Sequence, residues 1–112
     1  MPTIERKIEQ AVKRFLALLE GQYQIVDCLV YGSRARGTHR ADSDVDVAVL
    51  LSGEHGQFLA TKLNMADLAF DVLLETGILI SPLPIWMDEW EHPETYSNPL
   101  LLKNIEREGV HL

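Results

Sequence analysis

The feature that most constrains this chain is the stretch YGSRARGTHRADSDVDVAVLL at residues 31–51. It begins where one apolar run, residues 25–31, stops on a Gly-Ser pair, and it finishes in a second run, residues 44–51, whose first positions are polar. Short apolar runs bounded by Gly, Ser and Asp are typical of strands buried in a sheet. The stretch therefore predicts two strands, with a small-residue turn after the first and two carboxylates at the start of the second.

Apolar residues at helical spacing predict helices around these strands. The first helix covers residues 4–20, and the second runs from about 58 to 75 and ends at Gly77. The apolar positions of the second helix mark one face: 59, 63, 66, 70 and 73. A last helix starts after Asn98 and stops at Gly109.

A third strand is expected at residues 78–86, ILISPLPIW. Pro82 and Pro84 cannot donate hydrogen bonds, so this strand belongs at a sheet edge or in a distorted pairing. Strands that alternate with helices in a chain of 112 residues predict one domain, residues 1–112, of the α/β (α+β) class, with helices packed on a sheet of three or four strands.

Composition and charge exclude several kinds of protein. No window is long and apolar enough to span a membrane, and the one cysteine, Cys28, excludes an internal disulfide, so a cytoplasmic setting without membrane association is expected. Residues 1–40 carry seven Lys/Arg and four Asp/Glu, whereas residues 41–112 carry three and thirteen, which gives +3 and −10 and a total of −7. An acidic chain does not attract a polyanion, so direct nucleic-acid binding is disfavoured. The local exception is a group of arginines that suits one small phosphate-bearing ligand: Arg34, Arg36 and Arg40.

The opening stretch brings together residues that suit a metal and a phosphate. Side chains alternate along a strand, so Asp44 and Asp46 project from the same side, and two such carboxylates repel unless a cation lies between them. Mg²⁺ commonly takes one or two carboxylates and leaves its other positions to water and phosphate. Gly32 allows the backbone to approach a ligand, and Ser33 begins an expected short helix, residues 33–36, whose N-terminus suits an anion. The residues therefore predict a metal–nucleotide site.

Each motif alone is weak, because a D-x-D is usually a solvated strand face and a Gly-Ser pair is usually a turn. Together, Gly32-Ser33, ten intervening residues and Asp44-Val45-Asp46 form the pattern G-S-x(10)-D-x-D. This pattern resembles the signature of the DNA polymerase beta nucleotidyltransferase superfamily. The chain is similar to its smallest members, the minimal nucleotidyltransferase (MNT) proteins, and its closing LLLKNIEREGVHL looks like their terminal helix, glycine and strand.

The resemblance implies a mixed sheet flanked by helices that binds a nucleoside triphosphate, ATP, with Mg²⁺. Asp44 and Asp46 would be the metal ligands and catalytic carboxylates. Gly32 and Ser33 would hold the phosphates, with Arg34 and Arg36 as further nucleotide-binding candidates. The reaction would be transfer of AMP to an acceptor hydroxyl, with pyrophosphate leaving.

The resemblance also implies a biological role. MNT proteins are typically antitoxins encoded with a HEPN-domain ribonuclease toxin, and some silence the toxin by adding AMP to a tyrosine. The alternative is a catalytically weak or inactive nucleotide-binding module that neutralises the toxin by forming a complex; whether the chain is an oligomer stays open. An antibiotic-modifying transferase is a third option, which would need additional structure to enclose a drug.

One departure from the superfamily bears on catalysis. Its full set has a third carboxylate on the next strand, as metal ligand and base, but residues 78–86 contain no acid. The nearest acids are interpreted as surface charges: Asp71, Glu75, Asp88 and Glu89. A cluster of large side chains follows the same strand, for which core packing is the first interpretation and a protein interface the second; it comprises Trp86, Met87, Trp90 and Tyr96.

Overall fold

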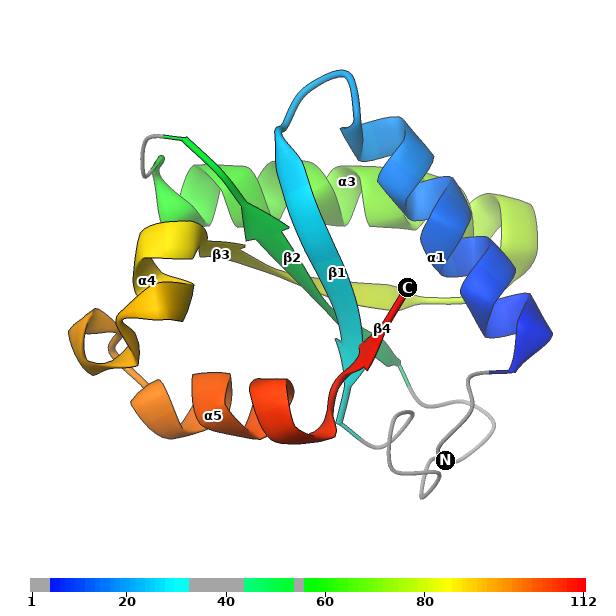
Figure 1. The fold of residues 1–112 in the computed structure, drawn as a ribbon. Coiled ribbons are helices and arrows are strands. Elements are labelled where there is room, and N and C mark those ends of the chain that lie inside the picture. The colour runs from blue at the N-terminus through cyan, green and yellow to red at the C-terminus, as the bar shows by residue number, and fades with distance from the viewer. Residues whose placement is uncertain (1–4, 33–43, 54–55) are drawn as a thin grey trace.

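A computed structural model describes residues 5–32, 44–53 and 56–112 of the chain (Figure 1). Helices and strands alternate along most of it. The elements are α1 (Arg6–Leu19), β1 (Ile25–Tyr31), β2 (Val45–Leu51), α3 (Phe58–Thr76), β3 (Ile80–Trp86), α4 (Met87–Glu91), the 3-10 helix η1 (Pro93–Thr95), α5 (Pro99–Glu108) and β4 (Val110–His111). The strands and the long helices expected from the sequence are confirmed, whereas α4 and η1 were not anticipated.

The strands form one four-stranded mixed sheet in the order β3-β2-β1-β4. β1 is antiparallel to both of its neighbours, and β2 is parallel to β3. β3 is an edge strand, as its two prolines predict. Val45 N donates to Leu79 O across the β2–β3 ladder, and alternate residues of a strand direct their N–H groups to the same side. The backbone nitrogens of Pro82 and Pro84 therefore face the open edge of the sheet, where no N–H donor is needed for the ladder.

Each face of the sheet is covered by its own pair of helices (Figure 1). α1 and α3 cover one face and enclose a cluster that includes Phe15, Val47 and Met65. α4 and α5 cover the other face, where Leu102 and Ile105 pack on strand residues such as Leu50. The sheet is therefore buried on both sides for most of its length, which explains why the strands are nearly continuous apolar runs.

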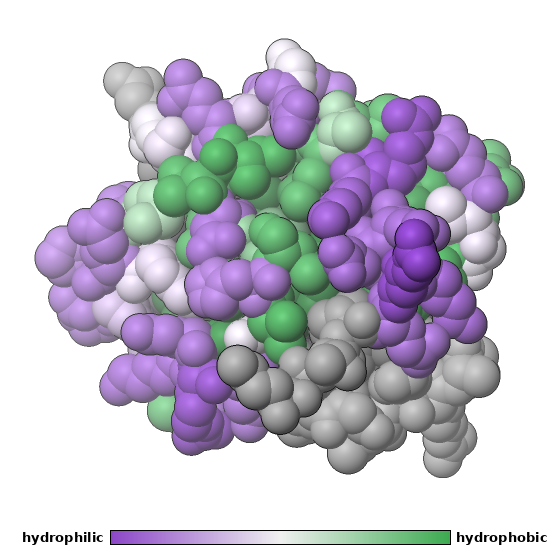
Figure 2. All heavy atoms as spheres, turned by 45° about the vertical axis from the view of Figure 1, so that its right-hand side comes forward, coloured by the Kyte–Doolittle hydropathy of each residue, from purple (hydrophilic) through white to green (hydrophobic). Residues whose placement is uncertain are grey.

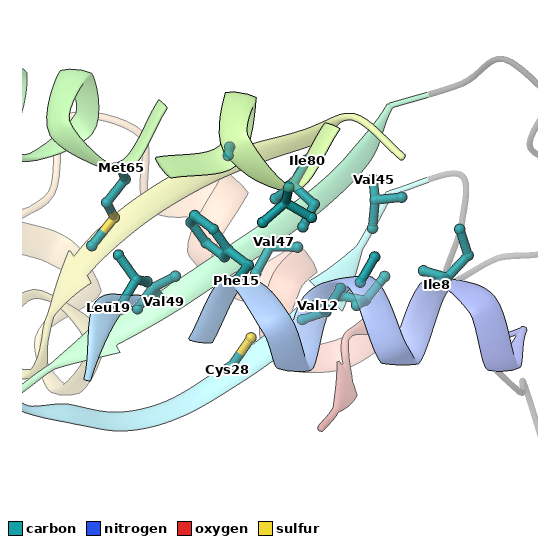
Figure 3. Close-up of a cluster of buried hydrophobic side chains, with 14 of the residues drawn as sticks. Ile8, Val12, Phe15, Leu19, Cys28, Val45, Val47, Val49, Met65 and Ile80 are labelled. Atoms are coloured by element: carbon teal, nitrogen blue, oxygen red, sulfur yellow. The ribbon is translucent and has the colours of Figure 1, made fainter. Parts of the chain in front are cut away.

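The layer between the sheet and α1 and α3 is the larger core. Figure 3 shows the Phe15 ring pointing from α1 into the middle of this layer, among valines of β2. Cys28 is buried in it, and burial raises the pKa of its thiol to about 12, as expected for a core cysteine. At the surface, Arg14 Nε donates to Glu75 Oε2 at 2.9 Å and ties α1 to α3.

The face that α3 turns to the sheet differs from the apolar face marked in its sequence. Its buried residues are Met65, Ala69 and Val72. Positions 59, 63, 66 and 70 are exposed, and position 73 is half-buried. The helix is apolar on both sides. The apolar stripe predicted from the spacing exists, but the prediction that this stripe faces the sheet is wrong.

The large side chains after β3 pack mostly as core. Trp86 is buried in the α1/α3 layer, and Met87, Trp90 and Tyr96 are half-buried against the α5 layer. Core packing, the first interpretation of this cluster, is therefore confirmed.

Apolar side chains also reach the surface. Figure 2 shows them gathered across the middle of the face turned to the viewer, bordered by hydrophilic ones. Over the whole described surface, large hydrophobic residues with high exposure are Val26, Phe58, Leu59, Leu63, Phe70, Leu74, Leu79 and Leu100, and most of these belong to α3. Among the described helices, none is long and apolar enough to cross a membrane.

The end of the chain closes the sheet as the sequence predicts. The Asn98 side chain accepts a hydrogen bond from Leu101 N at 3.3 Å and caps α5. Gly109 then lies so close to α5 and to Leu29 that an added Cβ would collide with the carbonyl oxygen of Ile105. A glycine is needed here to bring β4 back onto β1.

Two leucines of α5 provide a matched test of this packing. Leu102 is 1% exposed and Leu100 is 68% exposed. We expect Leu102→Ala to lower the free energy of unfolding by about 2–5 kcal/mol, because it opens a cavity beneath the sheet. Leu100→Ala should change it by less than about 0.5 kcal/mol. Urea denaturation followed by circular dichroism measures both, and equal effects would contradict the assigned faces of α5.

Candidate active site

The site is built at the point where β1 ends and β2 begins. The antiparallel register pairs Tyr31, the last residue of β1, with Asp46. Gly32 follows immediately, with a φ of 74°. A positive φ is the left-handed region that side chains with a Cβ avoid, so the turn that leaves β1 favours glycine for its conformation alone.

Gly32 is also needed because of what it touches. A Cβ built on it would lie 2.6 Å from Oδ2 of Asp46, closer than such atoms approach one another in proteins. The glycine of the G-S pair and the second carboxylate of the D-x-D therefore share one small space. This contact connects the two halves of the sequence pattern physically, although fourteen positions separate them.

The two carboxylates lie on the sheet face away from α1 and α3. Val45 and Val47 are buried in the α1/α3 layer, and alternation along the strand sends Asp46 to the opposite side, together with Asp44 just before β2. Asp46 is half-buried and Asp44 is exposed. One constrained and one accessible carboxylate, beside an approachable backbone, suit Mg²⁺ that keeps water and phosphate ligands.

Tyr31 borders the same space. Burial raises the pKa of its phenol to about 12, and the negative charge of Asp46 and then Tyr96 contribute. Tyr31 therefore stays protonated at neutral pH, and Asp46 supplies negative charge beside it. Tyr96, which follows η1, packs on the same side of the sheet as Tyr31, and sequence patterns missed the α4–η1 segment that leads to it. Helices as short as α4 and η1 have too few apolar residues to show a helical period in the sequence.

The position that faces Asp46 from β3 is Ser81. The parallel register pairs Asp46 with Ser81, and paired residues project from the same face of the sheet. Ser81 is half-buried and carries no charge. Where the superfamily pattern has a third carboxylate on this strand, this chain has a hydroxyl.

The four acids considered as replacements lie elsewhere. Asp71 and Glu75 are on α3, on the opposite side of the sheet, and Glu75 is paired with Arg14. Asp88 and Glu89 follow the far end of β3, and Ser81 is five residues, roughly 16 Å, before Trp86. The Glu89 carboxylate accepts a hydrogen bond from Trp86 N at 3.2 Å. Within residues 5–32, 44–53 and 56–112, no group of three or more His, Cys, Asp or Glu is placed to hold a metal.

The remaining predicted residues lie outside the described part of the chain. These are Ser33, Arg34, Arg36 and Arg40, with the short helix expected at residues 33–36. The structure brings Gly32, Asp44 and Asp46 to one end of the sheet, and the connection between them starts and finishes there.

A mixed sheet with a glycine turn on one strand and paired carboxylates on its antiparallel neighbour defines a nucleotidyltransferase fold. The family model "Polymerase beta, Nucleotidyltransferase" matches residues 13–80, more than half of the chain. The chain therefore belongs to this family, and the resemblance drawn from residues 31–51 is confirmed.

Several solved structures are similar to this one, and two of them show the extent of the likeness. A mutant of the MntA–HpeT toxin–antitoxin pair matches with a TM-score of 0.58 and 19% identity, over 93% of this chain and 70% of that one. A protein of Sulfolobus solfataricus classed as a nucleotidyltransferase matches with a TM-score of 0.53 and 14% identity, over 99% and 89%. At these identities the likeness shows the shared fold. No curated protein sequence matches the chain.

Alanine substitutions at two glycines with positive φ can distinguish loss of the Gly32–Asp46 contact from backbone strain alone. Gly77 has a φ of 76°, and nothing lies within 4 Å of the place that a Cβ would take, whereas Gly32 faces Asp46. We expect Gly32→Ala and Gly77→Ala each to lower stability by about 1–2 kcal/mol through strain. We expect Mg-ATP to raise the melting temperature of the parent protein, and only Gly32→Ala should also lose this rise, because it displaces Asp46. A Gly32→Ala protein that keeps the full Mg-ATP shift would show that this contact is dispensable.

Proposed function

We propose that this protein is a Mg²⁺-dependent nucleotidyltransferase that acts as an antitoxin, transferring AMP from ATP to a tyrosine hydroxyl of a partner HEPN toxin. The observation that carries the nucleotide chemistry is the contact between the Gly32 backbone and the Asp46 carboxylate. It leaves no room for a side chain at the turn, and it fixes one carboxylate at the place where a phosphate and a cation would meet.

Asp44 and Asp46 are the residues that would hold Mg²⁺. The bound ion would neutralise the phosphate oxygens at attack and departure, and positioning supplies much of the remaining catalysis in phosphoryl transfer. Asp46 is held by its strand and by Gly32, whereas exposed Asp44 can adjust to the ion. Such a pair can orient a triphosphate without a third protein ligand.

The proposed partner and the proposed acceptor hydroxyl are supported by other observations than the Gly32–Asp46 contact. The MntA–HpeT neighbour is a toxin–antitoxin pair and shares this fold. The MNT resemblance implies a HEPN toxin with a tyrosine acceptor, and the acidic charge of −7 disfavours nucleic acid as the acceptor. A cytoplasmic protein partner is the acceptor that agrees with these features.

A second function is favoured by Ser81. The acceptor hydroxyl must lose a proton as it attacks, and the β3 position that faces Asp46 offers no carboxylate to receive it. A general base contributes typically about 10²–10⁴-fold to a rate, so its loss leaves slow transfer or none. Under the second function, the protein binds nucleotide but neutralises the toxin by covering it.

Intact-mass spectrometry of the partner toxin separates the two functions. After incubation with Mg-ATP and the parent protein, we expect a slow mass gain of one AMP. The gain should disappear with the Asp44→Asn, Asp46→Asn double variant, because Mg²⁺ then loses both ligands. If the parent protein gives no adduct and the double variant still inhibits the toxin fully, neutralisation by covering is the function.

Ser81 allows a test by gain of function. Ser81→Asp places a carboxylate beside Asp46, so we expect AMP transfer to accelerate by about 10²-fold or more. Ser81→Asn is the matched control, since it has nearly the same shape without the charge or the base. Single-turnover rates of adduct formation measure the effect. Equal rates for the two variants would show that Ser81 does not occupy the place of the base.

A further inference from the structure

Helix α3 presents an apolar face to solvent as well as to the core. We call this the α3 outer face, and it consists of Leu59, Leu63, Ala66, Phe70 and Leu74. The four large residues are 54–71% exposed. The buried side of the same helix is formed by Met65, Ala69 and Val72. A helix with apolar residues on two sides is normally covered on both, and the α3 outer face is exposed among the described residues.

The size of this face points to a protein interface. Its large side chains together expose on the order of 500 Å², near the top of the range of about 300–600 Å² for the largest apolar patch on a typical monomer. A stable complex buries about 800 Å² on each partner. The remaining interface area would come from residues that border the face: Lys62, Asp67, Asp71 and half-buried Leu73. One helix face of this kind is thus sufficient for a small dimer interface.

The spacing of the face is self-complementary. Ala66 is at its centre, with Leu63 and Phe70 on either side and Leu59 and Leu74 at the ends. If two copies of α3 pack antiparallel about a two-fold axis near Ala66, Leu63 of each copy meets Phe70 of the other. The outer pair, Leu59 and Leu74, meets in the same way. A small residue at the crossing point lets two helices approach closely, and large residues on both sides fill the diverging space.

We propose that a second copy of this chain occupies the α3 outer face, so that the protein is a two-fold symmetric dimer with α3 packed against α3. The inference is independent of the proposed function. The α3 outer face and Asp46 lie on opposite sides of the sheet, so both active sites stay open in the dimer. A basic partner protein on this face is the competing occupant.

Charges beside the face distinguish these occupants. Asp67 follows Ala66 directly, so the two copies of Asp67 lie near each other at the axis of the dimer. Two exposed carboxylates repel weakly, and salt screens that repulsion. The homodimer should therefore tighten as salt rises or when Asp67 is neutralised. A basic partner would respond in the opposite direction, since it would lose an attraction.

Sedimentation equilibrium of the purified protein tests the proposal. We expect a dimer at micromolar concentration and, for Leu63→Glu, a dissociation constant raised by two orders of magnitude or more, because this variant places a charge in the apolar contact. Leu100→Glu is the matched control, because Leu100 is similarly exposed but lies on α5. It should remain dimeric. Far-ultraviolet circular dichroism and melting temperature show whether each variant is folded.

Asp67→Asn supplies the second measurement. Its dimer should be several-fold tighter than that of the parent protein, and the difference should shrink at high salt. A parent protein that stays monomeric at high micromolar concentration overturns the proposal, as does a dimer that Leu63→Glu leaves intact while it remains folded. A monomer that binds its toxin through this face, more weakly after Asp67→Asn, assigns the face to the basic partner.

Discussion

The antiparallel pairing of β1 with β2 is the interaction on which the rest of this structure depends. It places Tyr31 opposite Asp46, so that Gly32 leaves the sheet directly against a carboxylate. The same pairing fixes which strand residues face α1 and α3 and which face α5. A slip of one residue would turn Asp46 into the core and a valine toward the site. The chemistry and the packing of the protein are therefore set by a single register.

Much of this arrangement was available from the sequence because the relevant signals are local. The apolar runs of β1 and β2, the prolines of β3 and the Asn98 and Gly109 boundaries of α5 each act within a few residues, and each was placed correctly. Gly32, Asp44 and Asp46 could be assigned together because their spacing is specific. Their physical contact, however, depends on a turn geometry that no spacing rule contains.

The errors concern information that is not local. Helix α3 has apolar residues around most of its circumference, so periodicity could not decide whether Leu63 or Met65 faces the sheet. The absence of an acid from β3 was visible, but the identity of the residue beside Asp46 required the strand register, which gives Ser81. The α4–η1 segment was missed because two short turns have no period to detect, although Tyr96, which follows them, packs on the same side of the sheet as Tyr31.

The prolines of β3 have a consequence for how the protein avoids aggregation. An open sheet edge offers a row of unpaired N–H groups on which a strand from another molecule can grow. On β3, Pro82 and Pro84 remove two of these donors, and the next outward donor, Trp86 N, is already bonded to the Glu89 carboxylate. From Pro82 to Trp86, this edge therefore offers no unbonded outward N–H group. Molecules of this protein can meet through side chains of their helices, whereas this part of β3 offers no N–H donors from which a shared sheet could grow.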